Sequence, residues 1–245
     1  MKTLILANGN GERLRPLTLE KPKAMVEIDN KPLLLHIINH LKKYNFTEIV
    51  IAVGYKKEQI MNYFKDGQNF GVNISYSVSP EIQGTAGEIA RAKRFLEGED
   101  FMLYYGDVLT NLDLARFYKI HNESNSIITA PAMEEVYTES GIYLCEGKKV
   151  KSFHEKPFIN DFFKLPGIFS NVPVYMIAKE ALEHQNIAPD KDFSIDVMSD
   201  FVKNGQVKIF TQEGLWHLDI GSIKKYKVAC EAYKNNNPEK LRKLP

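Results

Sequence analysis

The chain has 245 residues with 32 basic and 31 acidic side chains, giving a formal net charge of +1 at pH 7. A nearly neutral chain offers no electrostatic basis for binding a nucleic acid or an anionic membrane surface. Its two cysteines form no C-x-x-C pair, and no stretch reaches the ~18 apolar residues of a membrane span. We therefore expect a cytoplasmic protein with neither a membrane nor a nucleic-acid partner.

The first segment combines a strand, a glycine loop and nearby cations. Leu4–Leu6 is apolar without alternation, which predicts a strand buried on both faces of a parallel sheet. The loop Asn8–Gly11 follows, and its residues let backbone N–H groups approach a ligand closely. Arg13 and Lys23 come next, so the segment predicts a phosphate-binding loop. Leu14 stands where a dinucleotide fingerprint needs its third glycine, which disfavours an NAD-binding oxidoreductase.

The spacing from Gly9 to Met25 reads G-x-G-x-R-L-x-P-L-T and then P-K-x-M. This pattern resembles the signature of the sugar-1-phosphate nucleotidylyltransferases, and related motifs extend over about residues 2–232. The resemblance implies an enzyme that makes an NDP-sugar and pyrophosphate from an NTP and a sugar 1-phosphate. Asn8 departs from the Gly or Ala that is usual at this position in the family, so the identity of the nucleobase stays open.

The next elements alternate between helix and strand. Apolar residues recur at helical spacing in two segments, and two further segments read as buried or half-buried strands. A β-α-β-α-β order predicts parallel strands joined by right-handed crossovers. The predicted ranges are helix 33–44, strand 48–53, helix 57–64 and strand 72–78.

A second glycine segment opens the following helix. The sequence from Glu81 to Gly87 reads E-I-Q-G-T-A-G and resembles a form found in the mannose and heptose guanylyltransferase branch. That resemblance implies that Gly84, Thr85 and Ala86 lie against the nucleoside. A Gly-Thr helix cap with no ligand is the alternative.

The strand Asp100–Tyr105 leads into Gly106 and Asp107. A carboxylate at the carboxyl end of a central parallel strand faces the crevice where open α/β sheets bind ligands. Magnesium prefers a few carboxylates together with substrate phosphates, so Asp107 is a candidate metal ligand. An N-cap role for Asp107 is the alternative.

The central part of the chain carries a third match, E-K-P, at Glu155 and Lys156. These residues could hold sugar hydroxyls and the sugar phosphate. The resemblance adds Gly141 against the sugar ring and Asn171, although Pro173 replaces the glycine of the family's N-x-G-x-Y. The intervening aromatic stretch is a candidate lid or oligomer contact. The predicted elements here are helix 112–121, strand 127–132 and a strand pair at 141–144 and 149–153.

The last segments read as helix 192–204, strand 207–211 and a strand that ends in D-I-G-S at residues 219–222. This motif resembles W-x-D-I-G-T, which makes Asp219 the expected second metal ligand beside Asp107. His217 is interpreted as a core residue. The polar tail 235–245 is expected to dock loosely or fray.

We expect one α/β domain over residues 1–234, with a Rossmann-like, mixed and mostly parallel sheet, flanking helices and a small antiparallel sheet on the sugar side. The expected cofactor is Mg²⁺, and a homo-oligomer is possible. Catalytic roles fall to Arg13 and Lys23, metal binding to Asp107 and Asp219, and sugar-phosphate binding to Gly141, Glu155, Lys156 and Asn171. The expected nucleotide site comprises Leu6, Ala7, Asn8, Gly9, Gly11, Glu81, Gly84, Thr85, Ala86 and Gly106.

GTP with a mannose- or heptose-type 1-phosphate is the favoured substrate pair, and UTP or dTTP with glucose 1-phosphate comes next. The product would supply polysaccharide or lipopolysaccharide synthesis. Two alternatives stay open. The acceptor could be a non-sugar phosphate such as phosphocholine, or the chain could be an inactive relative that binds a nucleotide sugar.

Overall fold

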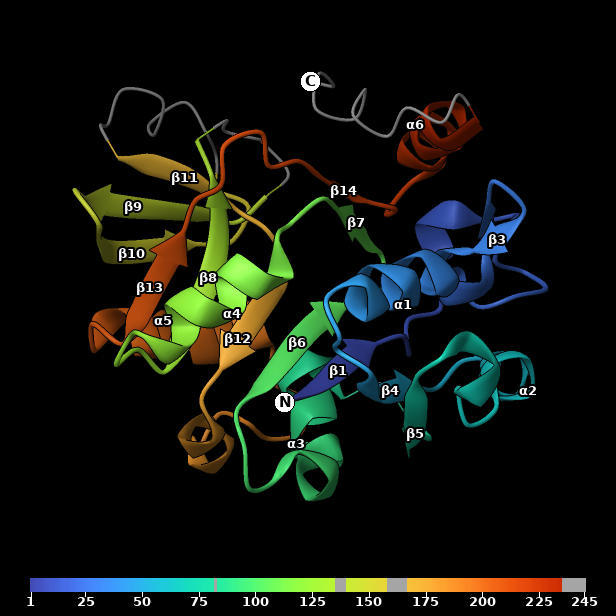
Figure 1. Ribbon diagram of the computed structural model, residues 1–245, viewed down its shortest axis with the longest axis horizontal. Helices are drawn as coiled ribbons and strands as arrows, with labels where there is room; N and C mark the ends of the chain where they lie inside the picture. The colour runs from blue at the N-terminus through green and yellow to red at the C-terminus, as the bar shows by residue number, and fades with distance from the viewer. Residues whose placement is uncertain (82, 135–139, 158–166, 235–245) are drawn as a thin grey trace. The chain divides into compact units, whose positions relative to one another are not determined.

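The computed structural model describes residues 1–81, 83–134, 140–157 and 167–234 (Figure 1). These residues divide into two compact units. Among the described residues, unit 1 comprises 1–81, 103–111 and 216–234, and unit 2 comprises 83–102, 112–134, 140–157 and 167–215. The expected tail 235–245 and most of the aromatic stretch lie outside the described residues. The division into a domain 1–234 and a tail therefore stays a prediction.

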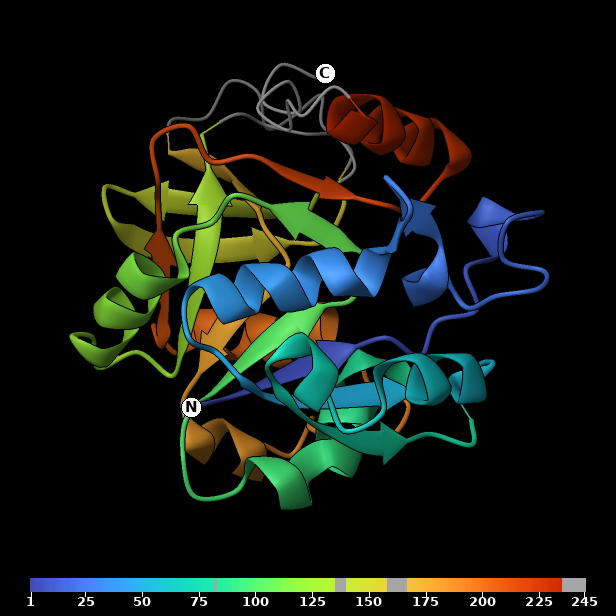
Figure 2. The same ribbon diagram turned by 45° about the vertical axis from the view of Figure 1, so that its right-hand side comes forward.

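Unit 1 contains a parallel sheet whose strands follow the order β6-β1-β4-β5. Leu4 lies beside Val50, and Val50 beside Ser75, in parallel register. In both ribbon views α1 lies on one face of this sheet (Figures 1 and 2). The elements are β1 Lys2–Leu6, β2 Glu27–Ile28, β3 Lys31–Pro32, α1 Leu33–Lys43, β4 Glu48–Val53, α2 Lys57–Phe64, β5 Asn73–Val78, β6 Phe101–Tyr105 (which begins in unit 2), β7 Val108–Thr110, β14 His217–Asp219 and α6 Ile223–Lys234.

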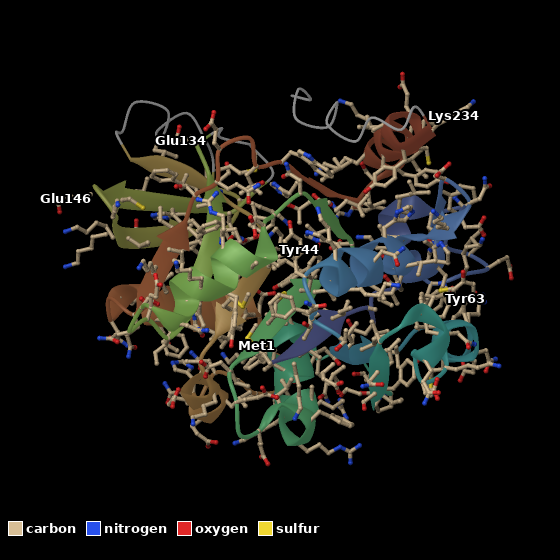
Figure 3. The ribbon with its side chains drawn as sticks, viewed as in Figure 1. Met1, Tyr44, Tyr63, Glu134, Glu146 and Lys234 are labelled. Carbon is tan, nitrogen blue, oxygen red and sulfur yellow. The ribbon has the colours of Figure 1, made fainter. Side chains whose placement is uncertain are left out.

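Two small antiparallel sheets accompany the parallel one in unit 1, β2 with β3 and β14 with β7. Unit 1 also has a hydrophobic cluster to which the turn after β1 and the elements β2, α1, β7 and α6 contribute. Its buried members are Leu14, Ile28, Leu33, Leu109, Trp216, Ile220, Ala229 and Ala232. Lys234 marks the end of α6 in the side-chain view (Figure 3). This cluster fixes the backbone from which several candidate site residues project.

Unit 2 contains strands in the order β10-β9-β11-β8-β12, with β13 parallel to β8. The other strand pairings in unit 2 are antiparallel, so this unit combines parallel and antiparallel pairings. The elements are α3 Gly84–Leu96, α4 Leu114–Asn122, β8 Ile128–Met133, β9 Ile142–Glu146, β10 Lys149–His154, β11 Ile168–Asn171, β12 Val174–Ile177, α5 Ser199–Lys203 and β13 Val207–Phe210. The expected fold class, α/β with a mixed, mostly parallel sheet and flanking helices, is confirmed.

The predicted helix 192–204 differs in detail. Its first part, Phe193–Met198, is a π-helix, and α5 follows at Ser199. Asp192 caps this turn by accepting from the N–H groups of Ser194 (2.8 Å) and Ile195 (3.0 Å). In the parts of the chain that the structure describes, no helix is long and apolar enough to cross a membrane.

Candidate active site

The loop after β1 is drawn tightly onto the segment that carries Lys23. Gly11 has φ 65°, and a Cβ there would lie 2.9 Å from Thr18 Cγ2 and 3.1 Å from Lys23 Cβ. Thr18 Oγ1 also donates a hydrogen bond to the Gly11 carbonyl (2.7 Å). Gly11 is therefore needed for close approach as well as for its backbone conformation. This packing places Lys23 beside the predicted phosphate loop.

Gly106 brings Asp107 against the end of β1. Its N–H donates to the Leu6 carbonyl (2.9 Å), and a Cβ at this position would lie 2.5 Å from the same oxygen. The Asp107 carboxylate that follows accepts a short charged hydrogen bond from Lys23 Nζ. The two motifs that the sequence placed far apart thus meet at one ion pair.

Backbone pairing brings the second carboxylate to the first. In the β7–β14 sheet Asp219 lies opposite Val108, and the N–H of Ile220 donates to the Asp107 carbonyl (2.8 Å). Asp107, in the turn immediately before β7, therefore lies beside the end of β14, which carries Asp219. Sequence reasoning paired these residues through a motif but missed β7, which is only three residues long.

Asp219 is surrounded by cations. Lys225 Nζ lies 2.5 Å from its Oδ2. Burial raises the pKa of Asp219, but Lys225, and behind it Lys23 and His217, outweigh burial and hold the pKa below its usual value. Asp219 is therefore ionised at neutral pH. Burial lowers the pKa of His217 to about 4 against the opposing effect of Asp219, so the ring is neutral at pH 7.

Arg13 joins the same group through Gly221. A Cβ at Gly221 would contact Asp219 Oδ1 and would lie 3.1 Å from Arg13 Nη2. All of these residues belong to unit 1. We call this group the cation–carboxylate cluster, and it consists of Arg13, Lys23, Asp107, Asp219 and Lys225. Its three cations outnumber its two carboxylates, which suits the binding of an anionic ligand.

The cluster also fits a divalent cation. Magnesium is commonly held by one or two carboxylates, with water and substrate phosphates completing its shell. Asp107 and Asp219 supply two such carboxylates. Among the described residues, no group of three or more His, Cys, Asp or Glu side chains could form an all-protein metal cage. A metal here would take its remaining ligands from a phosphate-bearing substrate and water.

In unit 2, the segment that opens α3 is packed on residues 188–193. Thr85 Oγ1 donates to Asp192 Oδ2 (2.9 Å) and accepts from the Phe193 N–H (2.7 Å). The Ala86 N–H donates to the Lys191 carbonyl (3.0 Å). A Cβ at Gly84 would collide with that carbonyl, so the glycine is required for this packing whether or not a nucleoside binds. Asp192, which no sequence motif singled out, anchors the segment.

The expected sugar-phosphate residues come together in unit 2. The Asn171 N–H donates to the Gly141 carbonyl (2.8 Å), and a Cβ at Gly141 would lie 2.9 Å from Glu155 Oε2. Burial raises the pKa of Glu155; Lys156 opposes this effect and Asp192 adds to it. Lys156 lies 3.8 Å from Glu155 and has φ 44°, an uncommon value for a lysine. These four residues form one local group.

The Asn171 side chain is held by two buried tyrosines. Its amide donates to Tyr175 Oη (2.7 Å) and accepts from Tyr143 Oη (2.8 Å). These bonds fix the amide and the strand that carries it. Of the remaining expected nucleotide residues, Leu6 and Ala7 are buried, Asn8 is half-buried and Glu81 is exposed. Their binding roles stay predictions.

A glycine loop after the first strand of a parallel sheet, with cations gathered around paired carboxylates, defines an α/β protein with a candidate phosphate-binding site. Residues 2–236 match the model of the nucleotidyl transferase family, and the chain belongs to that family.

Two curated relatives are similar over nearly the whole chain. Mannose-1-phosphate guanyltransferase beta-B of Xenopus laevis is 31% identical over 251 residues, covering 98% of this chain and 68% of the relative. UTP–glucose-1-phosphate uridylyltransferase of Synechocystis sp. is 29% identical over 241 residues, covering 92% and 61%. The chain thus spans about two thirds of the length of these relatives. The expected membership of the nucleotidylyltransferases is confirmed.

A solved structure supports the fold. A Bacillus anthracis protein that is provisionally assigned as a glucose-1-phosphate thymidylyltransferase, solved with sucrose, superimposes with a TM-score of 0.84. It is 19% identical, and the match covers 100% of this chain and 96% of that one.

Proposed function

We propose that this chain transfers a nucleotidyl group from an NTP to a sugar 1-phosphate, releasing pyrophosphate. The cation–carboxylate cluster is the observation that carries the proposal, because it assembles three cations and two metal-competent carboxylates beside a phosphate-type loop. The activities named for the Xenopus and Synechocystis relatives belong to the same reaction class.

The chemistry asks for positioning and charge neutralisation. The attacking group is an oxygen of a phosphate monoester whose second pKa is ~6, so it is largely ionised at neutral pH and needs no general base. This oxygen forms a new bond to the α-phosphorus of the NTP while the bond from that phosphorus to the β-phosphate oxygen breaks. Both reactants are anions, and the charge that develops on the departing pyrophosphate requires fixed cations.

We assign Arg13 and Lys23 to the triphosphate and its departing pyrophosphate. Asp107 and Asp219 would hold Mg²⁺, which when bound neutralises phosphate oxygens. Glu155 and Lys156 are assigned to the sugar phosphate from the E-K-P resemblance, with Gly141 and Asn171 shaping their surroundings. The segment at Gly84, Thr85 and Ala86 is assigned to the nucleoside.

GTP with a manno-configured 1-phosphate is the favoured pair, as in the activity named for the Xenopus relative. UTP or dTTP with glucose 1-phosphate comes next. A cytoplasmic location and a homo-oligomeric state stay predictions.

The test is pyrophosphate release with Mg²⁺ across a matrix of GTP, UTP, CTP, dTTP and ATP against mannose, glucose, N-acetylglucosamine and heptose 1-phosphates. We expect one strongly active combination. Silence across the matrix would reject sugar 1-phosphates as acceptors, and a second panel with phosphocholine would then separate a non-sugar acceptor from an inactive nucleotide-sugar binder.

A further inference from the structure

Lys225 is the member of the cluster that no sequence motif predicted. It lies in the first turn of α6, and its ammonium is 2.5 Å from Asp219 Oδ2. The two side chains are 27% and 30% exposed. The pair is therefore partly shielded from water, and its charges interact more strongly than those of a surface pair.

The position of Lys225 is unfavourable for a cation unless a carboxylate accompanies it. The N-terminus of a helix carries a partial positive charge, so acidic residues are preferred in the first turn. The first turn of α6 contains no acidic residue. The negative charge that compensates both the helix end and Lys225 is Asp219, which precedes the helix.

The backbone around Lys225 is fixed. Its N–H donates to Ser222 Oγ (3.4 Å), and the N–H of Tyr226 donates to the Ser222 carbonyl (2.9 Å). The buried Ala229 and Ala232 attach the helix to the hydrophobic cluster of unit 1. Lys225 therefore approaches Asp219 from a rigid base, whereas its neighbour Lys224 is exposed.

Each candidate metal carboxylate thus has its own lysine, Lys23 on Asp107 and Lys225 on Asp219. Lys23 has an assigned task on the phosphates. Lys225 has no assigned role, and its ammonium bonds Asp219 Oδ2, an oxygen that a divalent cation would also bind.

We infer that Lys225 is a positioning residue that neutralises Asp219 when no metal is present and lowers the affinity of the cluster for a free divalent cation. The inference rests on the proposed function in one respect, namely that Asp107 and Asp219 form the metal site. An incoming metal must displace the ammonium from Oδ2 or bind beside a like charge, and either event weakens binding. A metal that arrives with a triphosphate brings an anion that offers the displaced ammonium a new partner.

The direct test is a titration of the full chain with Mn²⁺, without nucleotide, followed by electron paramagnetic resonance of the free ion. Manganese accepts the same oxygen ligands as magnesium. We expect Lys225→Met to tighten Mn²⁺ binding on the order of tenfold, since one competing positive charge is removed. Lys225→Arg keeps the charge and should bind like the wild type, as should the matched control Lys224→Met.

Three outcomes separate this inference from the function on which it rests. Unchanged or weaker Mn²⁺ binding in Lys225→Met overturns the inference. Lys225→Gln is a second neutral variant, used if the first melts early in circular dichroism, and it is read in the same way. Asp219→Asn tests the metal site itself. Loss of binding in this variant supports the site, whereas wild-type binding rejects the site and the inference together.

Discussion

The ion pair between Lys23 and Asp107 has two separable effects, one on stability and one on catalysis. Lys23 is 16% exposed and Asp107 27% exposed, so the pair is neither a surface contact nor fully buried. Replacing Lys23 by methionine keeps the apolar stem but leaves the Asp107 carboxylate without its cation and beside a second carboxylate, Asp219. Both consequences follow from the loss of one charge.

The cost in stability can be bracketed. Breaking an exposed ion pair costs about 0–1 kcal/mol, and breaking a buried one about 3–5 kcal/mol. At this partial exposure we expect Lys23→Met to lose about 1–2 kcal/mol of unfolding free energy. For a chain of this size that loss lowers Tm by about 2–8 °C. Because Lys23 is assigned to the charge that develops on the departing pyrophosphate, kcat of Lys23→Met should fall by about 10²–10³-fold.

The assay combines thermal unfolding with pyrophosphate release for Lys23→Met, Asp107→Asn and the double variant. The variant that carries both Lys23→Met and Asp107→Asn should recover most of the stability, because it has no unpaired carboxylate at position 107. It should recover none of the activity. Lys21→Met is the matched control, since it removes an exposed ion pair to Glu27 (3.2 Å) in the same segment. Turnover of Lys23→Met within tenfold of the wild type would refute the catalytic assignment, and a double variant as unstable as Lys23→Met would refute the stranded-charge explanation.

Three further predictions concern the glycine, threonine and carboxyl groups of the site. Gly106→Ala should lose about 1–3 kcal/mol of stability, measured by urea unfolding, because its Cβ would lie 2.5 Å from a carbonyl of the first strand. Gly9→Ala, whose Cβ meets nothing within 4 Å, should leave stability unchanged, and equal losses would contradict the packing explanation. Thr85→Val should lose about 1–3 kcal/mol and raise the nucleotide KM, because the hydroxyl bonds both Asp192 and a backbone N–H. Thr85→Ser is its control, and a serine variant as impaired as the valine one would argue against these bonds. Burial raises the pKa of Glu155 in the folded chain above its usual 4.5, so its contribution to stability is present below pH 4.5 and is lost as the pH rises through the folded pKa. Glu155→Gln should therefore flatten the pH dependence of Tm above pH 4.5, and a profile parallel to that of the wild type would contradict the raised pKa.

Much of unit 1 could be predicted from the sequence, because its patterns are local. The predicted strand 48–53 and helix 57–64 coincide with β4 and α2. The continuous apolar run and the helical spacing decide these elements without help from the rest of the chain. The loop after β1 was equally readable from its glycines and prolines.

Other features depend on contacts that no local pattern contains. The helical period at 192–204 is present, but the period does not distinguish the π turn Phe193–Met198 from an α-helix. The lysine at the start of α6 looks like any surface lysine until Asp219 lies against it. Gly84 and Gly141 were explained by expected ligands, whereas the structure also gives them packing partners in Lys191, Phe153 and Glu155.

The assembly of unit 1 from separated stretches of chain has a consequence for synthesis. Thr110 Oγ1 donates a hydrogen bond to the Trp216 carbonyl, 106 residues later in the sequence (2.7 Å). A ribosome therefore delivers Arg13, Lys23 and Asp107 well before Asp219, with all of residues 112–215 in between. A nascent chain that stalls in that interval carries one carboxylate with its lysine but lacks the other pair. Assembly of the candidate metal site therefore waits for β14, because a nascent chain released before Asp219 lacks the second carboxylate.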